Sequence, residues 1–296
     1  MNEILTIKEM VKSFGNLDSE IEGIKNNGGY LLMDVDGCLI EGGLETVGNK
    51  KTLEEWGEEN QKEIELVRKN IILLQREGIK IGLSTGRGLE FSKRLIDYFF
   101  PKESGIVLNE NIVEGGLIIY DDKNEIERVS PCVDEESANL LKKNRIKIID
   151  IGVNIGGSVE EGKVLGISFN PPVGSDGRRD TDVFKDLLKK ELSDELCDKL
   201  VVTNSSTAVD ITPIGVDKMT AMESLVGSYS VIYLGDGRND ETSMKNNRVR
   251  INLAPANSHE AIKKLVSSGE KSGLISSEPE IKGVNQMLEF LIERLR

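Results

Sequence analysis

Short apolar runs alternate with amphipathic helical patterns through most of this chain of 296 residues, and this alternation constrains the fold more than any other feature. The expected strands are residues 30–35, 80–84, 105–108, 231–234 and 248–253. The expected helices are residues 59–76, 90–98, 218–225, 241–246, 260–267 and 281–295. Strand–helix–strand order predicts a parallel sheet that helices cover on both faces. The expected fold class is therefore α/β, with a doubly wound, Rossmann-like parallel sheet as its core.

The middle of the chain has a different order of elements. Its pattern predicts a helix that starts after Asp134, strands near 146–151 and 163–169, and a long helix near 182–200. Such an α+β order predicts a smaller cap domain that is inserted into the sheet domain. The expected division places the cap at 121–206 and the core at 1–120 and 207–296, with a helical extension at 1–29 ahead of the first strand.

The charge balance of the chain limits its partners. Fifty-one acidic and 38 basic residues give a net charge of −13, which argues against a nucleic acid or an anionic membrane as partner. Cys38, Cys132 and Cys197 are far apart in the sequence and odd in number, which is typical of a reduced intracellular protein. No apolar run is long enough to span a membrane. We therefore expect a cytoplasmic protein with no membrane partner.

Two carboxylates follow the first expected strand, in the sequence "DVDG". Aspartate and glycine are common in turns, so this motif alone is a weak signal. Asp34 and Asp36 nevertheless repel each other at this spacing, and their repulsion calls for a cation or a proton.

Three further motifs strengthen the functional interpretation of "DVDG". "STGR" (84–87) ends the next strand with groups that can hold phosphate oxygens, "GVDK" (215–218) puts Lys218 at a helix start, and "GDGRND" (235–240) adds two more carboxylates. Taken singly, each has an ordinary interpretation, as a helix cap, a solvated lysine or an acidic first turn. Taken together, three of the four motifs end parallel strands, which gathers them at one edge of the sheet.

In this order the four motifs resemble those of the haloacid dehalogenase superfamily of phosphatases. The position of the insert, between the second and third motifs, is similar to that of the Cof-type branch with a class IIB cap. The resemblance implies a Mg²⁺-dependent phosphomonoester hydrolase that acts through an aspartyl-phosphate. The implied substrate is a small phosphorylated metabolite, such as a sugar phosphate or a phosphoglycolate-like compound.

The resemblance also implies roles for individual residues. Asp34 would be the nucleophile and Asp36 the general acid and base, while Thr85 and Lys218 would hold the phosphoryl group and complete the catalytic set. The implied substrate-binding residues are Ser84, Gly86, Arg87 and Asn239. The implied ligands of Mg²⁺ are Asp34, Asp36, Asp236 and Asp240. Physical chemistry agrees with this set, because a carboxylate that attacks a phosphate dianion needs a hard cation and an ammonium to offset the repulsion.

Two alternatives stay open from the sequence. A phosphomutase of the phosphomannomutase type shares the aspartyl-phosphate but returns the phosphoryl group to a sugar. A non-catalytic protein that binds sugar phosphates could use the same fold, although binding alone needs no acid at Asp36. The sequence does not identify the metabolite, and it leaves the oligomeric state open between a monomer and a homodimer.

Overall fold

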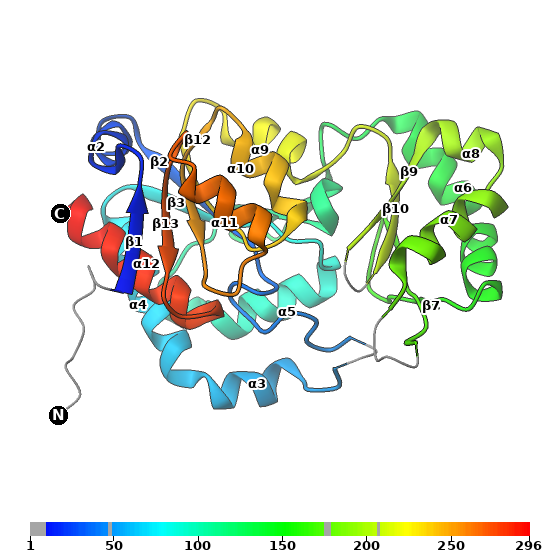
Figure 1. The fold of residues 1–296 in the computed structure, drawn as a ribbon, viewed down its shortest axis with the longest axis horizontal. Coiled ribbons are helices and arrows are strands. Elements are labelled where there is room, and N and C mark those ends of the chain that lie inside the picture. Colours follow the sequence, from blue (N-terminus) through cyan, green and yellow to red (C-terminus); the bar gives the residue numbers. More distant parts are fainter. Residues whose placement is uncertain (1–9, 47–48, 175–178, 206–207) are drawn as a thin grey trace.

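A six-stranded, mainly parallel sheet forms the centre of the core (Figure 1). The computed structural model describes residues 10–46, 49–174, 179–205 and 208–296. The strand order is β1 (Val11–Phe14), β13 (Ser272–Ser276), β12 (Val249–Ala254), β11 (Ser230–Leu234), β2 (Gly29–Met33) and β3 (Ile79–Leu83). Only the pair of β1 and β13 is antiparallel within this sheet. The predicted α/β fold class is confirmed.

The register of the central strands brings their carboxyl ends level. Met33 of β2 lies opposite Leu234 of β11 on one side and Leu83 of β3 on the other. All five residues of β2 are buried, because helices cover both faces of the sheet. The residues that follow each strand therefore meet at one edge, where the first, second and fourth motifs begin.

Helices pack on the two faces of the sheet over separate apolar clusters. The larger cluster includes residues of α2 (Leu17–Asn27), α3 (Leu53–Glu59), α4 (Gln61–Arg76), α5 (Leu89–Phe99) and α12 (Glu280–Leu295). The other includes residues of α9 (Lys218–Val226), α10 (Glu241–Lys245) and α11 (Glu260–Ser267). Short 3₁₀ turns lie at η1 (Lys102–Ser104), η2 (Glu114–Gly116) and η3 (Arg238–Asp240).

A second unit with its own apolar core stands beside the sheet domain, on the right of Figure 1. Its antiparallel sheet has the order β7 (Ser158–Val159), β8 (Ile167–Asn170), β10 (Val209–Pro213) and β9 (Leu200–Asn204). Its helices are α6 (Glu135–Asn154), α7 (Thr181–Glu191) and α8 (Asp194–Lys199). The boundaries of the cap at residues 121 and 206 stay a prediction. The antiparallel sheet of this unit continues past residue 206, because β10 ends at Pro213.

A small antiparallel sheet connects the two units along the chain. It contains β4 (Glu110–Val113), β5 (Ile118–Asp121) and β6 (Ile126–Val129) in that order. Because β5 pairs with β6 through Asp121 and Ile126, regular structure runs across the predicted boundary at residue 121.

Several expected elements differ from the structure. Residues 11–14 form an edge strand instead of part of a helical extension, while residues 1–9 lie outside the described part. Residues 105–108 are not a strand, and the next strand begins at Glu110. The expected strand at 146–151 lies inside α6, because Leu141 and Ile148, seven residues apart, both face the cap core. The expected helix at 182–200 is two helices, since α7 ends at Glu191 and α8 begins at Asp194.

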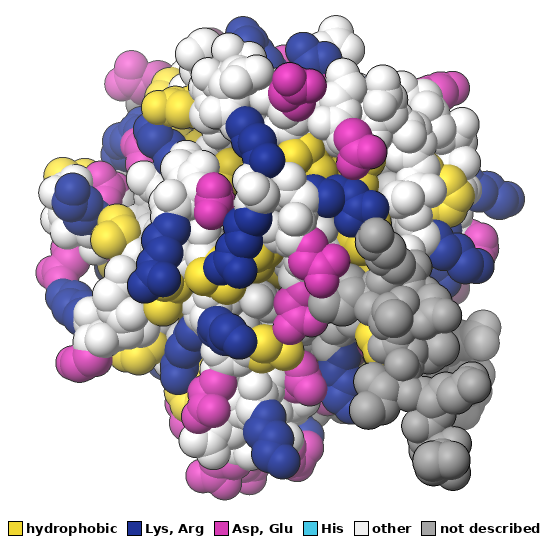
Figure 2. All heavy atoms as spheres, turned by 90° about the vertical axis from the view of Figure 1, so that its left-hand side faces the viewer, with side chains coloured by type: hydrophobic (Ala, Val, Ile, Leu, Met, Phe, Trp, Pro, Cys, Tyr) yellow, Lys and Arg dark blue, Asp and Glu magenta, His cyan; other side chains and the backbone are white. Residues whose placement is uncertain are grey.

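The surface carries charges of both signs. Figure 2 shows Lys, Arg, Asp and Glu side chains intermingled over one face of the molecule. Cys38, Cys132 and Cys197 are all free, so none of the three forms a disulfide. Within the described ranges, no helix combines the length and the apolar character that crossing a membrane requires.

The packing of α12 beneath the sheet yields a prediction on stability. Leu291 is fully buried in the larger apolar cluster, so Leu291→Ala should lower the free energy of unfolding by about 2–5 kcal/mol through lost burial and a cavity. Glu293→Ala, at an exposed position of the same helix, should change it by less than about 0.5 kcal/mol. The free energy of unfolding of both variants is measured in urea. If Leu291→Ala and Glu293→Ala lower it equally, α12 is not part of the core.

Candidate active site

Lys218 is the centre of the candidate site. It is the first residue of α9, where Asp217 caps the helix through a reciprocal pair of hydrogen bonds with Thr220. Its Nζ donates to Asp34 Oδ1 and to Asp240 Oδ1, both at 2.8 Å. The side chains of Lys218, Asp34 and Asp240 are 3%, 5% and 0% exposed. Water therefore solvates their charges very little, and the three groups must balance one another.

The carboxylates around Lys218 carry more charge than one ammonium offsets. Burial raises the pKa of Asp34 well above its usual range, and the charges of Asp240 and Asp236 add to this effect against the opposing pull of Lys218. Burial and Asp240 raise the pKa of Asp236 to about 7. Burial opposes the charged form of Lys218, but Asp240 and Asp34 keep the pKa of this ammonium well above its usual value. The site therefore favours an additional positive charge.

Asp236 lies close to Asp34. The first motif turns tightly at Gly37, between Asp36 and Cys38, and this turn makes room for Asp236. Gly37 has a φ of +72°, and a Cβ atom at this position would lie 2.1 Å from Asp236 Oδ2. One ligand atom each from Asp34, Cys38 and Asp236 falls within a group whose atoms are all within 4.8 Å of one another. The glycine of "DVDG" is thus required by the approach of the fourth motif as well as by the turn.

The chemistry of this donor set fits a hard cation such as Mg²⁺. Asp34 and Asp236 offer carboxylate oxygens, which are the ligands that Mg²⁺ prefers. Burial raises the pKa of the Cys38 thiol well above its usual range, so Cys38 stays protonated and is a poor ligand. Asp240 uses Oδ1 for Lys218 and Oδ2 for the amide of Gly237, so in this arrangement it holds the lysine and the loop. Asp34, Asp36, Asp236 and Asp240 as metal ligands all remain predictions.

Asp36 forms an ion pair with Arg87 of the second motif. Arg87 Nε lies 2.7 Å from Asp36 Oδ2, and its terminal nitrogen donates to Asp36 Oδ1. The guanidinium also stacks 4.4 Å above the ring of Phe91, and Arg87 is 8% exposed. This two-point contact places the predicted acid and base beside the predicted phosphate-binding loop.

The remaining predicted site residues lie in different surroundings. Thr85 is buried, and its hydroxyl accepts a hydrogen bond from the amide of Arg87, which shapes the loop. Gly86 and Asn239 are exposed at the same edge of the sheet as the second and fourth motifs. Ser84 is fully buried and bonds to the hydroxyl of Tyr233 at 3.1 Å, while its role in substrate binding stays a prediction.

Tyr233 is a part of the site that sequence reasoning did not find. Its hydroxyl donates to Asp240 Oδ1 at 3.1 Å and bonds to Ser84, so it connects the second and fourth motifs below the surface. Burial and the charge of Asp240 raise the pKa of Tyr233 far above its usual value, so it stays a neutral donor. Its position in "VIYLGDG" is a signal only in hindsight, because an aromatic residue in a buried strand is ordinary core.

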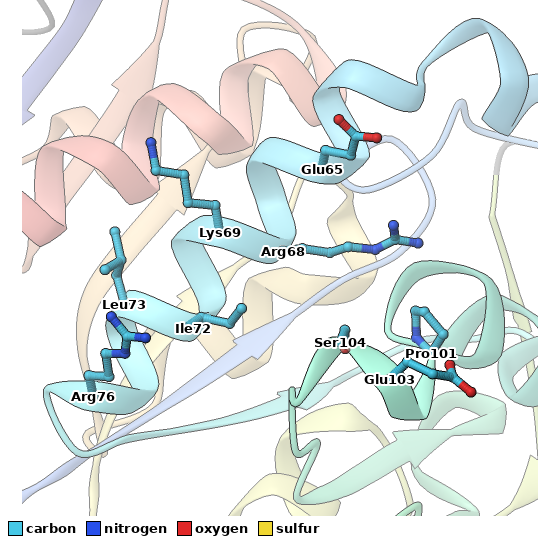
Figure 3. A pocket seen from close by; sticks show the side chains of 9 residues that line it. All are labelled: Glu65, Arg68, Lys69, Ile72, Leu73, Arg76, Pro101, Glu103 and Ser104. Carbon is cyan, nitrogen blue, oxygen red and sulfur yellow. The ribbon is translucent and has the colours of Figure 1, made fainter.

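A separate surface groove lies away from these residues. Figure 3 shows it between α4 and the segment at η1. Its volume is about 640 Å³. Arg68 on its wall donates to the backbone carbonyls of Tyr98 and Phe99, which joins α4 to the end of α5. The lining residues come from outside the four motifs.

Comparison with known families supports the resemblance that the motifs predict. A family model described as haloacid dehalogenase-like hydrolase matches residues 177–284, which contain the third and fourth motifs. No curated protein matches the chain in sequence.

Solved structures show the same fold over nearly the whole chain. The sucrose-phosphatase from Synechocystis, in complex with sucrose and phosphate, has a TM-score of 0.58 at 15% identity and covers 90% of this chain and 98% of its own. A haloacid dehalogenase-like hydrolase from Bacteroides thetaiotaomicron has a TM-score of 0.59 at 16% identity, with 89% and 99% covered. The C-terminal domain of trehalose-6-phosphate phosphatase from C. albicans has a TM-score of 0.60 at 13% identity, with 96% and 99% covered. The predicted resemblance to haloacid dehalogenase-like hydrolases is confirmed.

The raised pKa of Asp236 predicts how stability depends on pH without metal. A carboxyl whose pKa is about 7 in the folded chain and near 4 when unfolded binds its proton more tightly when folded, so stability falls as the pH rises through this range. Asp236→Asn should therefore raise the free energy of unfolding at pH 8 in EDTA by about 1–3 kcal/mol and change it little at pH 4. Urea unfolding at both pH values measures this, with exposed Asp186→Asn as control. A less stable Asp236→Asn protein at pH 8 would contradict the repulsion described here.

Proposed function

We propose that this haloacid dehalogenase-like hydrolase is a Mg²⁺-dependent phosphatase that hydrolyses a small phosphomonoester, with a sugar phosphate as the favoured substrate class. The observation that carries the proposal is the contact between Lys218 and Asp34 at the end of β2, with Asp236 close to Asp34. This arrangement combines a fixed carboxylate with an ammonium and a place for a hard cation. Phosphoryl transfer needs mainly positioning and neutralisation of charge, and these groups supply both.

The proposed reaction has two displacements at phosphorus. An oxygen of Asp34 attacks phosphorus while the bond to the leaving alkoxide breaks, and Asp36 gives that alkoxide a proton. Asp36 then takes a proton from water, whose oxygen attacks the aspartyl-phosphate and releases phosphate and the free Asp34 carboxylate. Lys218 holds Asp34 in place for the attack and, through its contact with Asp240, is itself held at the edge of the sheet.

Arg87 must change its partner during this reaction. It engages both oxygens of Asp36, so neither oxygen of this carboxylate is open to a leaving group or to water. A guanidinium binds phosphate oxygens in the same forked geometry that it uses for a carboxylate. Substrate phosphate would therefore draw Arg87 away from Asp36 and free Asp36 for proton transfer, with Thr85 and Gly86 as further phosphate contacts.

Asp34 and Asp236 are the proposed ligands of Mg²⁺, with Asp36 and Asp240 completing the acidic set around them. When bound, the ion would neutralise part of the charge that the carboxylates and the substrate phosphate share. The excess negative charge around Lys218 supports this assignment.

The sugar-phosphate class has separate support. Two structural neighbours are named as phosphatases of sucrose and trehalose phosphates, although at 13–15% identity they show only the fold. Gly162 of the second unit lies close to Gly88 of the predicted phosphate-binding loop, and Lys163 beside it pairs with Asp210 of β10 at 2.8 Å. Charged groups of both signs suit the hydroxyl groups of a sugar.

A screen for phosphatase activity tests the proposal as a whole. The purified chain is incubated with Mg²⁺ and a panel of sugar phosphates, phosphoglycolate, nucleotides and para-nitrophenyl phosphate, and released phosphate is measured. Hydrolysis of one or more sugar phosphates with the highest kcat/KM supports the proposal. No phosphate release from any member above the rate of an Asp34→Asn protein would overturn it.

Asp34→Asn is the most direct test of the nucleophile. The amide keeps the shape of the side chain but cannot attack phosphorus as an anion, so kcat should fall by at least about 10³-fold. The folded state should persist, because the change also relieves repulsion around Lys218. Asp186→Asn, exposed on α7, should retain the activity of the unmodified chain. Near-normal turnover by folded Asp34→Asn would exclude an aspartyl-phosphate at this residue.

Removal and replacement of metal test the proposed cofactor. Hydrolysis should stop in EDTA, return with Mg²⁺, and be inhibited by Ca²⁺, which accepts more ligands in looser geometry. Rates are measured on exhaustively chelated protein to which each ion is then added. Full activity without any divalent ion would refute the metal assignment.

A further inference from the structure

Glu114 is a buried acid of the core that the proposed chemistry does not use. It begins η2, directly after β4, and is 3% exposed. Its φ is +51°, in the left-handed region that a residue other than glycine adopts only at a cost. A buried carboxylate on a strained backbone needs compensating contacts, and these lie in both units of the molecule.

The carboxylate of Glu114 binds a segment of the cap. Its Oε1 accepts a hydrogen bond from the amide of Val164, and its Oε2 accepts from the amides of Leu165 and Gly166, both at 3.0 Å. Three backbone donors on one carboxylate are strong, charge-assisted contacts in a place that water barely reaches. They attach the segment directly before β8 to the core at a single side chain.

The backbone of η2 binds the predicted phosphate-binding loop. The amide of Glu114 donates to the carbonyl of Arg87 at 3.0 Å, and the amide of Gly115 donates to the carbonyl of Thr85 at 2.9 Å. A Cβ atom on Gly88, next in that loop, would lie 2.5 Å from the carbonyl oxygen of Gly162 in the cap. The loop, η2 and the cap segment are therefore in direct contact.

The cap segment is fixed from its other side by Arg145 of α6. The guanidinium donates to the carbonyls of Lys163, Leu165 and Gly166 at 2.9–3.3 Å. Backbone amides of the segment thus face Glu114 while its carbonyls face Arg145. Lys163 in this segment has a side chain that is only 7% exposed, and it pairs with Asp210.

We infer that Glu114 is a positioning residue that sets the distance between the phosphate-binding loop and the cap segment 163–166. The inference rests on the proposed function, in which the core holds the phosphate and the cap holds the leaving group. Glu114 contacts both the phosphate-binding loop and the cap segment. A change in its contacts therefore moves the cap, which holds the leaving group, relative to the phosphate. Asp34, Asp36 and Lys218 are not altered by this change. A misplacement of about 1 Å can lower a rate by about 10²-fold.

The test compares Glu114→Gln with the matched control Glu110→Gln. In Glu114→Gln, an NH₂ group replaces one carboxylate oxygen and faces a backbone N–H. Some of the hydrogen bonds to the cap segment are therefore lost, while the shape of the side chain is kept. The side chain of Glu110, at the start of β4, forms a partly exposed ion pair with Arg128, so its replacement should be nearly neutral. The substrates are a panel of hexose and disaccharide 6-phosphates and, as a minimal probe, para-nitrophenyl phosphate.

We expect Glu114→Gln to lower kcat/KM for the best sugar phosphate by about 10- to 100-fold and that for the aryl phosphate by less than about threefold. Hydrogen exchange at the amides of Val164, Leu165 and Gly166 should become faster in this variant alone. Equal losses on both substrates, or unchanged exchange at these amides, would overturn the inference. If Glu114→Gln does not fold, Glu114→Asp, which keeps the charge but shortens the reach, is judged by the same ratio.

The exchange measurement separates this inference from the proposed function. If the unmodified chain hydrolyses no member of the panel, the proposed function fails. Faster exchange at the three amides in Glu114→Gln would still establish that Glu114 binds the cap segment. Were the chain active but its ratio of substrates insensitive to Glu114, the proposed function would stand and the positioning role would fall.

Discussion

The concentration of buried carboxylates around one ammonium is the constraint on which the rest of the site depends. Lys218 binds Asp34 and Asp240 at equal distances, and Asp236 lies close by, so three acids share one fixed positive charge. Such an arrangement lowers the stability of the metal-free fold, because burial raises the cost of each unbalanced charge. The sheet, its helices and the left-handed turn at Gly37 together hold it in place. A site that is costly to the fold and suited to a cation is typical of catalysis.

Much of this site could be predicted because local sequence and sheet geometry agree. Buried parallel strands end at "DVDG", "STGR" and "GDGRND", and the level register of Met33, Leu83 and Leu234 turns that linear order into spatial proximity. Pattern alone also identified most core helices, since both faces of a parallel sheet need apolar helix faces. What the pattern predicted least well was the cap, where Ile148 belongs to a helix although its neighbours favour a strand.

The features that were missed depend on contacts between distant residues. Tyr233 and Ser84 are 149 positions apart, and the edge strand β1 is defined by its pairing with β13 near the other end of the chain. Glu114 is an ordinary acid in an "EGG" turn until its carboxylate meets the amides of residues some 50 positions later. Neither propensity nor spacing reports such pairs, because tertiary packing decides them.

In the proposed mechanism, residues at the edge of the sheet would perform the chemistry, and Glu114 would set the distance between them and the cap. In this mechanism Asp34 takes the phosphoryl group before water does. The stereochemical course at phosphorus tests this most directly, with a substrate made chiral at phosphorus by oxygen isotopes and sulfur. Two successive displacements, first by Asp34 and then by water, predict retention of configuration. Inversion would mean a single direct attack by water and would contradict the account.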